Sequence, residues 1–398
     1  MSHKTISVAL IIGAQVACMT LWFSASAVVP NLISTGQIST ERGSLLTGAV
    51  QIGFVTGTLI STFFGLADRF DPRRLFCAAA IAGSLVNALI LGVGFNDPWT
   101  IPLRFITGVV LAGIYPVGMK MAAGWARHNI GLMIGALVGA LTLGSALPHL
   151  FTALSNLDWR TVIMTASLCS LAGAGAILLI RLGPAHKKAG RFRPGLVLDA
   201  LRNRSILLAN GGYLGHMWEL YAMWAWIGAF LAWGLHQDGT NQFNPALITF
   251  FVVASGAVGC LAAGAAADRY GRTTTTIAAM AVSGSCAALI GFTPLIGPVW
   301  MIAVAIIWGF SVVADSAQFS AAITELSEPA LVGTMLTVQT CMGFLLTTIA
   351  IQIVPVMVDL VTWRYAFAFL AIGPCLGILS MWRLRYQADA SHLANGRR

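Results

Sequence analysis

The chain has 398 residues, of which 57% are hydrophobic and 9% are charged, and its mean hydropathy is +0.81. Soluble domains carry about a quarter of their residues as Asp, Glu, Lys and Arg, so this composition disfavours any protein whose main solvent is water. The net charge of +9 does not indicate nucleic-acid binding, because the sequence has no basic face with interleaved aromatic residues.

Apolar stretches long enough to cross the ~30 Å hydrocarbon core of a bilayer, at about 1.5 Å of helix rise per residue, follow one another along the whole chain. We therefore expect an all-α membrane protein with twelve transmembrane helices, six in each half. The spans expected in the first half cover residues 6–28, 44–66, 75–95, 101–125, 131–153 and 161–180. Those expected in the second half cover residues 206–235, 245–267, 273–294, 298–322, 331–358 and 366–381.

A hydrophilic segment, residues 181–205, separates the two groups of spans. It is rich in Lys, Arg, Pro and Gly, a composition typical of a linker. The expected domains are therefore an N-terminal six-helix bundle, residues 1–180, and a C-terminal six-helix bundle, residues 206–398.

Short sequence echoes relate the two halves. Ala67-Asp68-Arg69 recurs 200 positions later as Ala267-Asp268-Arg269, and Trp159-Arg160 recurs 204 positions later as Trp363-Arg364. Two echoes at nearly the same offset predict parallel six-helix repeats, an arrangement typical of carriers.

The cations are distributed unevenly between the two sides of the predicted membrane. With the N-terminus in the cytoplasm, most of the 23 Lys and Arg residues lie on the cytoplasmic side, the linker set included, and Arg42, Arg160 and Arg364 lie on the outer side. This distribution follows the positive-inside rule. We expect a monomeric integral protein of a bacterial inner membrane, surrounded by lipid, with both termini in the cytoplasm.

Four formal charges lie inside the predicted spans: Arg104 and Lys120 in the fourth, Glu219 in the seventh and Asp315 in the tenth. A charge at the bilayer centre costs about 2.5–3.5 kcal/mol on insertion scales, so such residues face protein or water and mark a pathway. His216 lies one turn before Glu219 on the same helical face, and a carboxylate beside an imidazole is suited to proton exchange. The alternative is that Glu219 and His216 pair as structural glue.

Three short motifs resemble those of a known family. Residues 264–272 (Gly-Ala-Ala-Ala-Asp-Arg-Tyr-Gly-Arg) resemble the G-x-x-x-D-R-x-G-R loop signature of the major facilitator superfamily. The first-half copy, residues 65–74, departs from it, with Asp71-Pro72 where one Gly is usual. Arg104 and Gly108 on the fourth span resemble the R-x-x-x-G motif of the same family. The resemblance implies two six-helix bundles that rock about a central cavity.

The resemblance also implies roles for individual residues. The loop motifs are expected to act as a conformational gate formed by Asp68, Arg69, Arg73, Asp268, Arg269 and Arg272. The family often links the Arg of the fourth span to proton movement, although this Arg could instead be an anchor at the membrane interface. The proton-coupling candidates are therefore Glu219, Asp315, His216 and Arg104.

In this family the first, fourth, seventh and tenth spans line the cavity, which implies a set of residues for solute contact. The candidates on these spans are Gln15, Trp22, Lys120, Trp218, Tyr221 and Gln318, and Gln339 on the eleventh span is a further candidate. We expect Lys120 or Arg104 to neutralise an anionic group of the solute. Lys120 is also close enough to the cytoplasmic end of its span to reach the membrane surface instead.

We expect a proton-coupled secondary transporter of a small solute that works by alternating access. The alternatives are a uniporter or facilitator and a drug efflux carrier, although the fifth span lacks the G-P-x-x-G-G pattern of drug antiporters. A membrane receptor or enzyme is less well supported, because HExxH and GxxxxGK motifs are absent from the sequence. No cofactor and no metal are expected, since the seven cysteines lie in apolar segments without a CxxC pair.

The solute itself is not indicated by these motifs. Residues 21–26 and the segments around Glu219 and Asp315 look most like bacterial carriers grouped loosely with nitrate/nitrite and cyanate permeases. Nitrate porters, however, carry arginines in the second and eighth spans and an Asn-Gly-Gly signature, and this sequence has neither.

Overall fold

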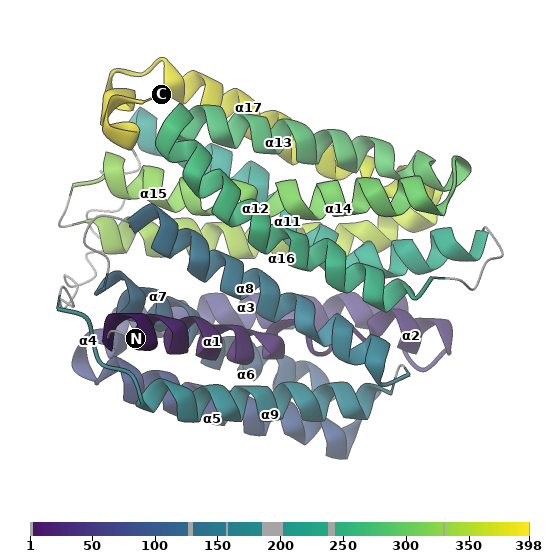
Figure 1. Ribbon diagram of the computed structural model, residues 1–398. Helices are drawn as coiled ribbons and strands as arrows, with labels where there is room; N and C mark the ends of the chain where they lie inside the picture. Colours follow the sequence, from purple (N-terminus) through teal and green to yellow (C-terminus); the bar gives the residue numbers. More distant parts are fainter. Residues whose placement is uncertain are drawn as a thin grey trace.

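A computed structural model describes residues 3–125, 130–156, 158–184, 202–237, 243–328 and 331–397, and within these ranges the chain is helical with no strands. Figure 1 shows two bundles of long helices packed side by side, one from the first half of the chain and one from the second. The two termini lie at the same end of the molecule. Most of the predicted linker falls outside the described residues, so the exact domain boundaries stay a prediction.

The helices follow one another in chain order with short connections. The first bundle contains α1 (His3–Phe23), α2 (Val29–Ser34), α3 (Thr40–Phe64), α4 (Leu66–Arg69), α5 (Pro72–Val93), α6 (Thr100–Leu111), α7 (Tyr115–Ala123), α8 (Ile130–Leu154) and α9 (Trp159–Leu178). The second contains α11 (Arg204–Gln237), α12 (Pro245–Tyr270), α13 (Arg272–Leu289), η2 (Ile290–Leu295), α14 (Pro298–Ala314), α15 (Ser316–Leu326), α16 (Val332–Ala366), η3 (Ala368–Ala371), α17 (Ile372–Arg385) and η4 (Ala388–Gly396).

Eleven helical segments among the described residues are long and apolar enough to span a membrane. The remaining predicted span corresponds to α11, a helix of 34 residues. Three of its polar residues, Asn210, His216 and Glu219, are buried. The predicted membrane fold is therefore confirmed, and α11 carries two of the proton-coupling candidates.

Three of the predicted spans are interrupted. The first ends at Phe23 and turns before α2 begins, the fourth breaks between α6 and α7, and the tenth breaks at Asp315 between α14 and α15. The sequence did not indicate these breaks, because hydropathy measures apolar length and does not report where a helix stops. Irregular backbone at membrane depth is tolerated where protein buries it or where it lines a cavity, and residues 24–28 are all buried.

In each bundle, two helices cross in close contact at a glycine. A Cβ atom on Gly108 of α6 would overlap the carbonyl oxygen of Val50 on α3, and one on Gly309 of α14 would overlap that of Val252 on α12. The two crossings lie about 200 positions apart, as the sequence echoes do. Close approach of backbones through small residues is the usual way in which membrane helices associate, so the Gly of the R-x-x-x-G motif has a packing role.

The two bundles meet along two helix pairs, α3 with α16 and α8 with α12. We call this contact surface the seam. The Ser44 hydroxyl of α3 donates a hydrogen bond of 2.6 Å to the side-chain oxygen of Gln352 on α16. The seam is therefore closed by direct contacts between helices of opposite halves.

The two copies of the loop motif lie at the end of the molecule that also holds the termini, which we call the motif end. In the second copy, Gly271 has a φ of 90° at the start of α13, a conformation that favours glycine. In the first copy, Asp71 caps α5 by accepting from the backbone N–H of Arg73, and Pro72 occupies the first turn. The Arg73 guanidinium, 2.7 Å from the carboxylate, holds the pKa of Asp71 below its usual value. The departure of the first copy from the family signature is thus a different way to begin a helix.

We predict that Gly309→Ala destabilises the protein, because the added methyl group collides with the Val252 backbone of a close-packed crossing. Overpacking of this kind costs about 1–3 kcal/mol, so the thermal unfolding midpoint of the purified protein should fall. The matched control is Gly175→Ala on α9, where a Cβ would meet open space and the midpoint should hold or rise. Equal midpoints for the two variants would show that the crossing is not tightly packed.

Candidate functional site

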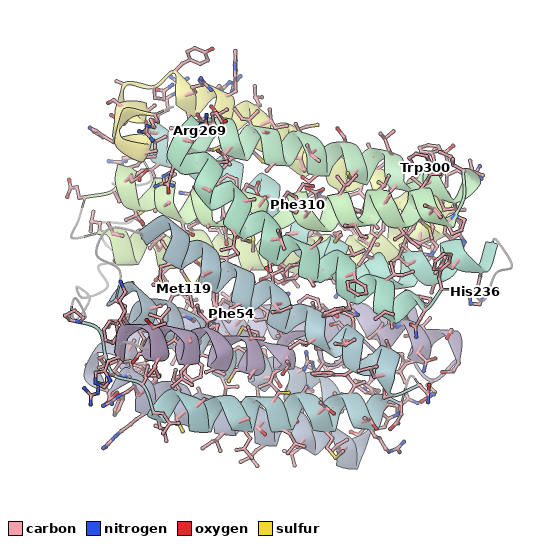
Figure 2. The ribbon with its side chains drawn as sticks, viewed as in Figure 1. Phe54, Met119, His236, Arg269, Trp300 and Phe310 are labelled. Carbon is pink, nitrogen blue, oxygen red and sulfur yellow. The ribbon has the colours of Figure 1, made fainter. Side chains whose placement is uncertain are left out.

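A cluster of aromatic side chains fills the seam near the middle of the molecule. We define the seam aromatic cluster as Trp22 of α1, Phe54 of α3, Tyr221 and Trp224 of α11, and Phe344 of α16, all of which are buried. The ring centroids of Trp22 and Tyr221 are 5.9 Å apart, and those of Phe54 and Phe344 are 4.7 Å apart. Each of these pairs joins the two bundles. Figure 2 shows Phe54 where the bundles meet, away from both ends of the molecule.

Polar atoms without partners accompany these rings. The indole N–H groups of Trp22 and Trp224 and both amide atoms of Gln51 are buried and have no hydrogen-bond partner among the described residues. Gln51 lies one helical turn before Phe54 and so shares its face of α3. A buried polar group without a partner costs about 1–3 kcal/mol, and native structures retain few of them. The cluster therefore offers hydrogen-bonding groups that a ligand or water would satisfy.

Glu219 is fully buried on α11 among neutral donors. Its carboxylate accepts hydrogen bonds from the Ser283 hydroxyl of α13, at 2.8 Å, and from the Trp308 indole N–H of α14, at 2.6 Å. No salt bridge joins it to a Lys or Arg of the described ranges. A buried carboxylate without a counter-ion is costly in its charged form, so the site suits a group that gains and loses a proton.

His216 and Asp315 form a second buried pair beside Glu219. The His216 Nδ1 atom lies 2.8 Å from a carboxylate oxygen of Asp315, which stands at the break between α14 and α15. The other imidazole nitrogen is buried and has no hydrogen-bond partner in the part of the chain that the structure describes. The alternative that His216 pairs with Glu219 is therefore wrong, because each uses a different partner from the neighbouring helices.

Arg104 donates hydrogen bonds to the last carbonyl groups of α1. Its guanidinium donates to the carbonyl oxygens of Leu21, at 3.1 Å, and Trp22, at 2.6 Å, and to the side chains of Ser24 and Asn87, at 3.1 and 3.3 Å. The last carbonyls of a helix have no partner within it and carry partial negative charge. The alternative of an interface anchor is wrong, since Arg104 is fully buried.

The other residues expected to line the cavity are distributed over several environments. Trp22 and Tyr221 belong to the seam aromatic cluster, whereas Gln15 is buried against Gly118 of α7 and its amide lacks a partner among the described residues. Lys120 donates to the carbonyl oxygen of Ala67 at the motif end, at 3.0 Å. The rest bond within the second bundle: Trp218 to the Phe369 carbonyl, Gln339 to Asn210 and Gln318 to Arg272.

The gate candidates lie together at the motif end but differ in their contacts. Arg272 forms a bidentate pair with Glu325 of α15, with N–O distances of 2.6 and 2.7 Å. Arg69 and Asp268 are exposed, and Arg269, also at this end in Figure 2, stacks on the ring of Tyr270 at 5.2 Å. The Asp68 side chain and residues 126–129 and 329–330, close to the starts of α8 and α16, fall outside the described set. A gate between the two halves stays a prediction.

The η4 segment covers the motif end of the second bundle. The backbone N–H of Ala394 donates to Glu325 at 3.1 Å, and the Ser205 hydroxyl at the start of α11 donates to Asp389 at 2.8 Å. The Arg272–Glu325 pair therefore lies within a local network that includes the C-terminal segment.

Several residues of the site were not identified from the sequence. Ser283 and Trp308 could not be assigned to Glu219, because nothing local marks helices that meet only in the folded protein. Phe54 and Phe344 are two among 20 phenylalanines. Gln51 could have been found, since a search of the spans for uncharged amides as well as charges would have included it.

Comparison with known proteins identifies the same family as the sequence motifs. A model of the Major Facilitator Superfamily matches residues 10–314. A gallate transporter of Pseudomonas putida is 28% identical over 144 residues, 32% of this chain and 31% of that protein. An uncharacterised MFS-type transporter of Enterobacter sp. (strain 638) is 27% identical over 238 residues, 56% of this chain and 58% of that protein. The chain thus matches about a third and somewhat more than half of the length of these relatives.

Two solved structures share the fold. A mutant of the nucleoside transporter NupG superposes with a TM-score of 0.72 at 14% identity, covering 97% of this chain and 100% of that one. The human organic anion transporter MFSD10 (TETRAN) superposes with a TM-score of 0.67 at 13% identity, covering 96% of this chain and 100% of that one. At these identities the likeness concerns the fold alone. Because the family model covers most of the sequence, the chain belongs to the major facilitator superfamily.

Proposed function

We propose that this transporter carries a small planar aromatic carboxylate together with a proton, by alternating access of its two bundles. The observation that carries the proposal is the seam aromatic cluster, to which both bundles contribute rings. A planar solute inserted there contacts both halves at once. Rocking of the bundles then exposes the solute to one side of the membrane or the other.

The groups around the cluster suit a ring that bears oxygen atoms. Aromatic rings stack or meet edge to face with a planar solute. The unpartnered indole N–H groups of Trp22 and Trp224 can donate to a carboxylate or phenol oxygen, and the Gln51 amide can donate or accept. The relative from Pseudomonas putida is a gallate transporter, and gallate is an aromatic carboxylate with ring hydroxyls.

Charge balance favours a proton as the companion of such a solute. The guanidinium of Arg104 is engaged by carbonyls of α1, and Lys120 donates to the Ala67 carbonyl at the motif end. Neither cation points to the seam aromatic cluster through these contacts. The buried groups Glu219, His216 and Asp315 can instead take up a proton when the solute binds.

The α11 helix provides the mechanical link between proton and solute. Tyr221 follows Glu219 by two positions, about 200° around the helix axis, so the two side chains occupy opposite faces. Tyr221 meets Trp22 across the seam, while Glu219 bonds to Ser283 and Trp308 within the second bundle. Protonation of Glu219 weakens its bonds to α13 and α14, which shifts the packing of the helix that holds the solute. In this proposal the motif end faces the cytoplasm, in agreement with the positive-inside rule.

We predict that Glu219→Gln abolishes proton-driven accumulation and spares solute exchange. The amide fits the same space and still bonds to Trp308 and Ser283, but it cannot release a proton. In proteoliposomes with an imposed pH gradient, the variant should bring labelled gallate only to equal concentrations on the two sides, while exchange stays within a few-fold of the unmodified protein.

The matched control is Glu41→Gln, which changes an exposed carboxylate at the start of α3 and should accumulate gallate normally. Accumulation against a concentration gradient by Glu219→Gln would overturn the assigned role of Glu219. Unmodified protein that equilibrates gallate without responding to the pH gradient would identify a uniporter. A screen of thermal stabilisation by aromatic acids, sugars, amino acids and nucleosides provides the solute if gallate is not carried.

We predict that Trp22→Phe raises the KM for the aromatic carboxylate about tenfold and changes the maximal rate less. The substitution keeps a ring in the cluster but removes an N–H donor, and hydrogen bonds to charged groups contribute about 1.5–3 kcal/mol. Initial rates of uptake as a function of solute concentration provide the measurement. Trp99→Phe, which alters an exposed indole at the start of α6, should leave the KM unchanged. An unaltered KM in Trp22→Phe would remove this indole from the solute site.

A further inference from the structure

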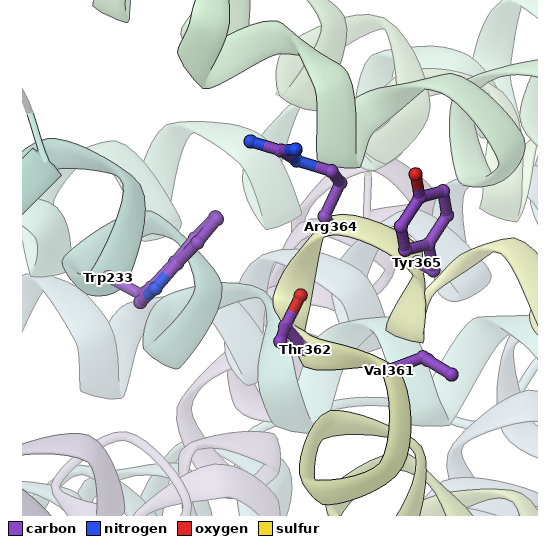
Figure 3. Close-up of a pocket in the computed structure, with 5 residues that line it drawn as sticks. All are labelled: Trp233, Val361, Thr362, Arg364 and Tyr365. Carbon is purple, nitrogen blue, oxygen red and sulfur yellow. The ribbon is translucent and has the colours of Figure 1, made fainter.

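A cavity separate from the seam opens at the end of the molecule opposite to the motif end. It has a volume of about 470 Å³ and is lined by Trp233 of α11 and by Val361, Thr362, Arg364 and Tyr365 at the end of α16. Figure 3 shows the Arg364 guanidinium extended toward the side of the cavity where Trp233 lies. A cation and two aromatic rings therefore line one cavity that is open at the surface, where Thr362, Arg364 and Tyr365 are exposed.

The first-half echo of this segment shows an ordinary helix start. Asp158 caps α9 by accepting from the backbone N–H groups of Arg160 and Thr161. The Arg160 guanidinium covers the ring of Trp159, 4.4 Å from its centroid. In this copy the Arg side chain therefore stacks on the Trp side chain that precedes it.

The second-half copy uses the same dipeptide differently. Thr362 stands where the first copy has its capping Asp, and its backbone has a φ of 62° and a ψ of 169°. Trp363 packs on Phe230 and Phe367, with centroids 6.0 and 5.5 Å away. Arg364 has no salt bridge to the described part of the chain. The guanidinium that the first copy stacks on its own Trp is here turned toward the cavity.

Contacts with η2 hold the backbone of residues 362–365 in this conformation. A positive φ in a residue other than glycine costs about 1–3 kcal/mol and persists where neighbouring structure imposes it. A Cβ on Gly291 of η2 would overlap the carbonyl oxygen of Arg364, so the two backbones touch. Phe292 meets the ring of Tyr365 edge to face, with centroids 5.4 Å apart. These contacts fix the loop with Arg364 and Thr362 facing the cavity.

We infer that this cavity is a binding site for an aromatic carboxylate, distinct from the site in the seam. The planar guanidinium of Arg364 matches the two oxygens of a carboxylate. The Trp233 and Tyr365 rings offer faces and edges to an aromatic ring, and the Thr362 hydroxyl can bond to either oxygen. The site holds the anion outside the seam, on the side from which it enters or to which it is released. The role of the bound anion as a transported solute rests on the proposed function, whereas binding at this cavity is tested separately from the seam site.

Site-specific protection tests the inference on the full-length protein. Val361→Cys introduces a thiol on the cavity wall, and its modification by a membrane-impermeant maleimide is measured by mass spectrometry of the peptide that contains residue 361. The protein is placed in nanodiscs of phosphatidylcholine, and benzoate is the probe. Benzoate should slow the modification, whereas benzamide, which lacks the charge, and acetate, which lacks the ring, should protect at least about tenfold less well.

Variants in the Val361→Cys background assign the effect. Arg364→Gln should raise the benzoate concentration that gives half-maximal protection about tenfold or more, as expected for loss of a charged hydrogen-bonding partner. For Arg364→Lys this concentration should lie between the values for the Val361→Cys protein and for its Arg364→Gln variant. The matched control Arg160→Gln changes the echo of the same dipeptide and should leave protection intact. Glu219→Gln should also leave it intact, even if it abolishes coupled transport. Elution of each variant as a single species in size-exclusion chromatography checks folding.

Three outcomes would overturn the inference. Equal protection by benzamide would show that the carboxylate is not recognised. Undiminished protection in Arg364→Gln would remove the guanidinium from the site. Protection by phosphatidylglycerol in the nanodisc, with none by benzoate, would identify Arg364 as a contact for lipid headgroups instead.

Discussion

The bond between Arg104 and the end of α1 is the interaction on which the central site depends. Hydrocarbon offers no hydrogen bonds, so a helix that stops inside a membrane leaves carbonyl groups that protein must satisfy. Arg104 supplies the donors to Leu21 and Trp22, and Ser24 and Asn87 complete the network. The first span can therefore end at Phe23 and present the Trp22 ring to the other bundle. Arg104, which the sequence singles out as a charge within the fourth span, thus stabilises the end of α1.

The repeat of the chain accounts for the scaffold, and divergence between its copies accounts for the functional groups. Both bundles cross their helices at a glycine, Gly108 in one and Gly309 in the other. The buried titratable pair of His216 and Asp315 and the nearby Glu219 lie in the second bundle. In the first bundle the buried cation Arg104 bonds to carbonyls and neutral side chains. Similar backbones thus hold buried ionisable groups on one side of the seam and a buried cation bonded to carbonyl groups on the other.

Interrupted helices bring backbone that is not helical into the interior of the protein. The breaks after α1, between α6 and α7 and at Asp315 bring irregular backbone and polar side chains into the protein interior. By contrast, α11 is continuous and carries Tyr221 on one face and Glu219 on another. One continuous helix therefore contacts the seam through Tyr221 and contacts α13 and α14 through Glu219.

The sequence by itself determined the membrane environment, the number of spans and the family, because apolar length, charge distribution and loop motifs are local properties. It also identified Glu219, His216 and Asp315 as ionisable residues within the spans, since such residues are unusual in apolar segments. Only the tertiary structure decided which of these groups pair. His216 meets Asp315 rather than Glu219, Arg104 meets the α1 carbonyls, and Trp22 meets Tyr221, because each contact joins helices distant in the chain. The conformation of Thr362 and the cavity beside Arg364 likewise follow from packing against η2 and α11, which no local pattern in the sequence records.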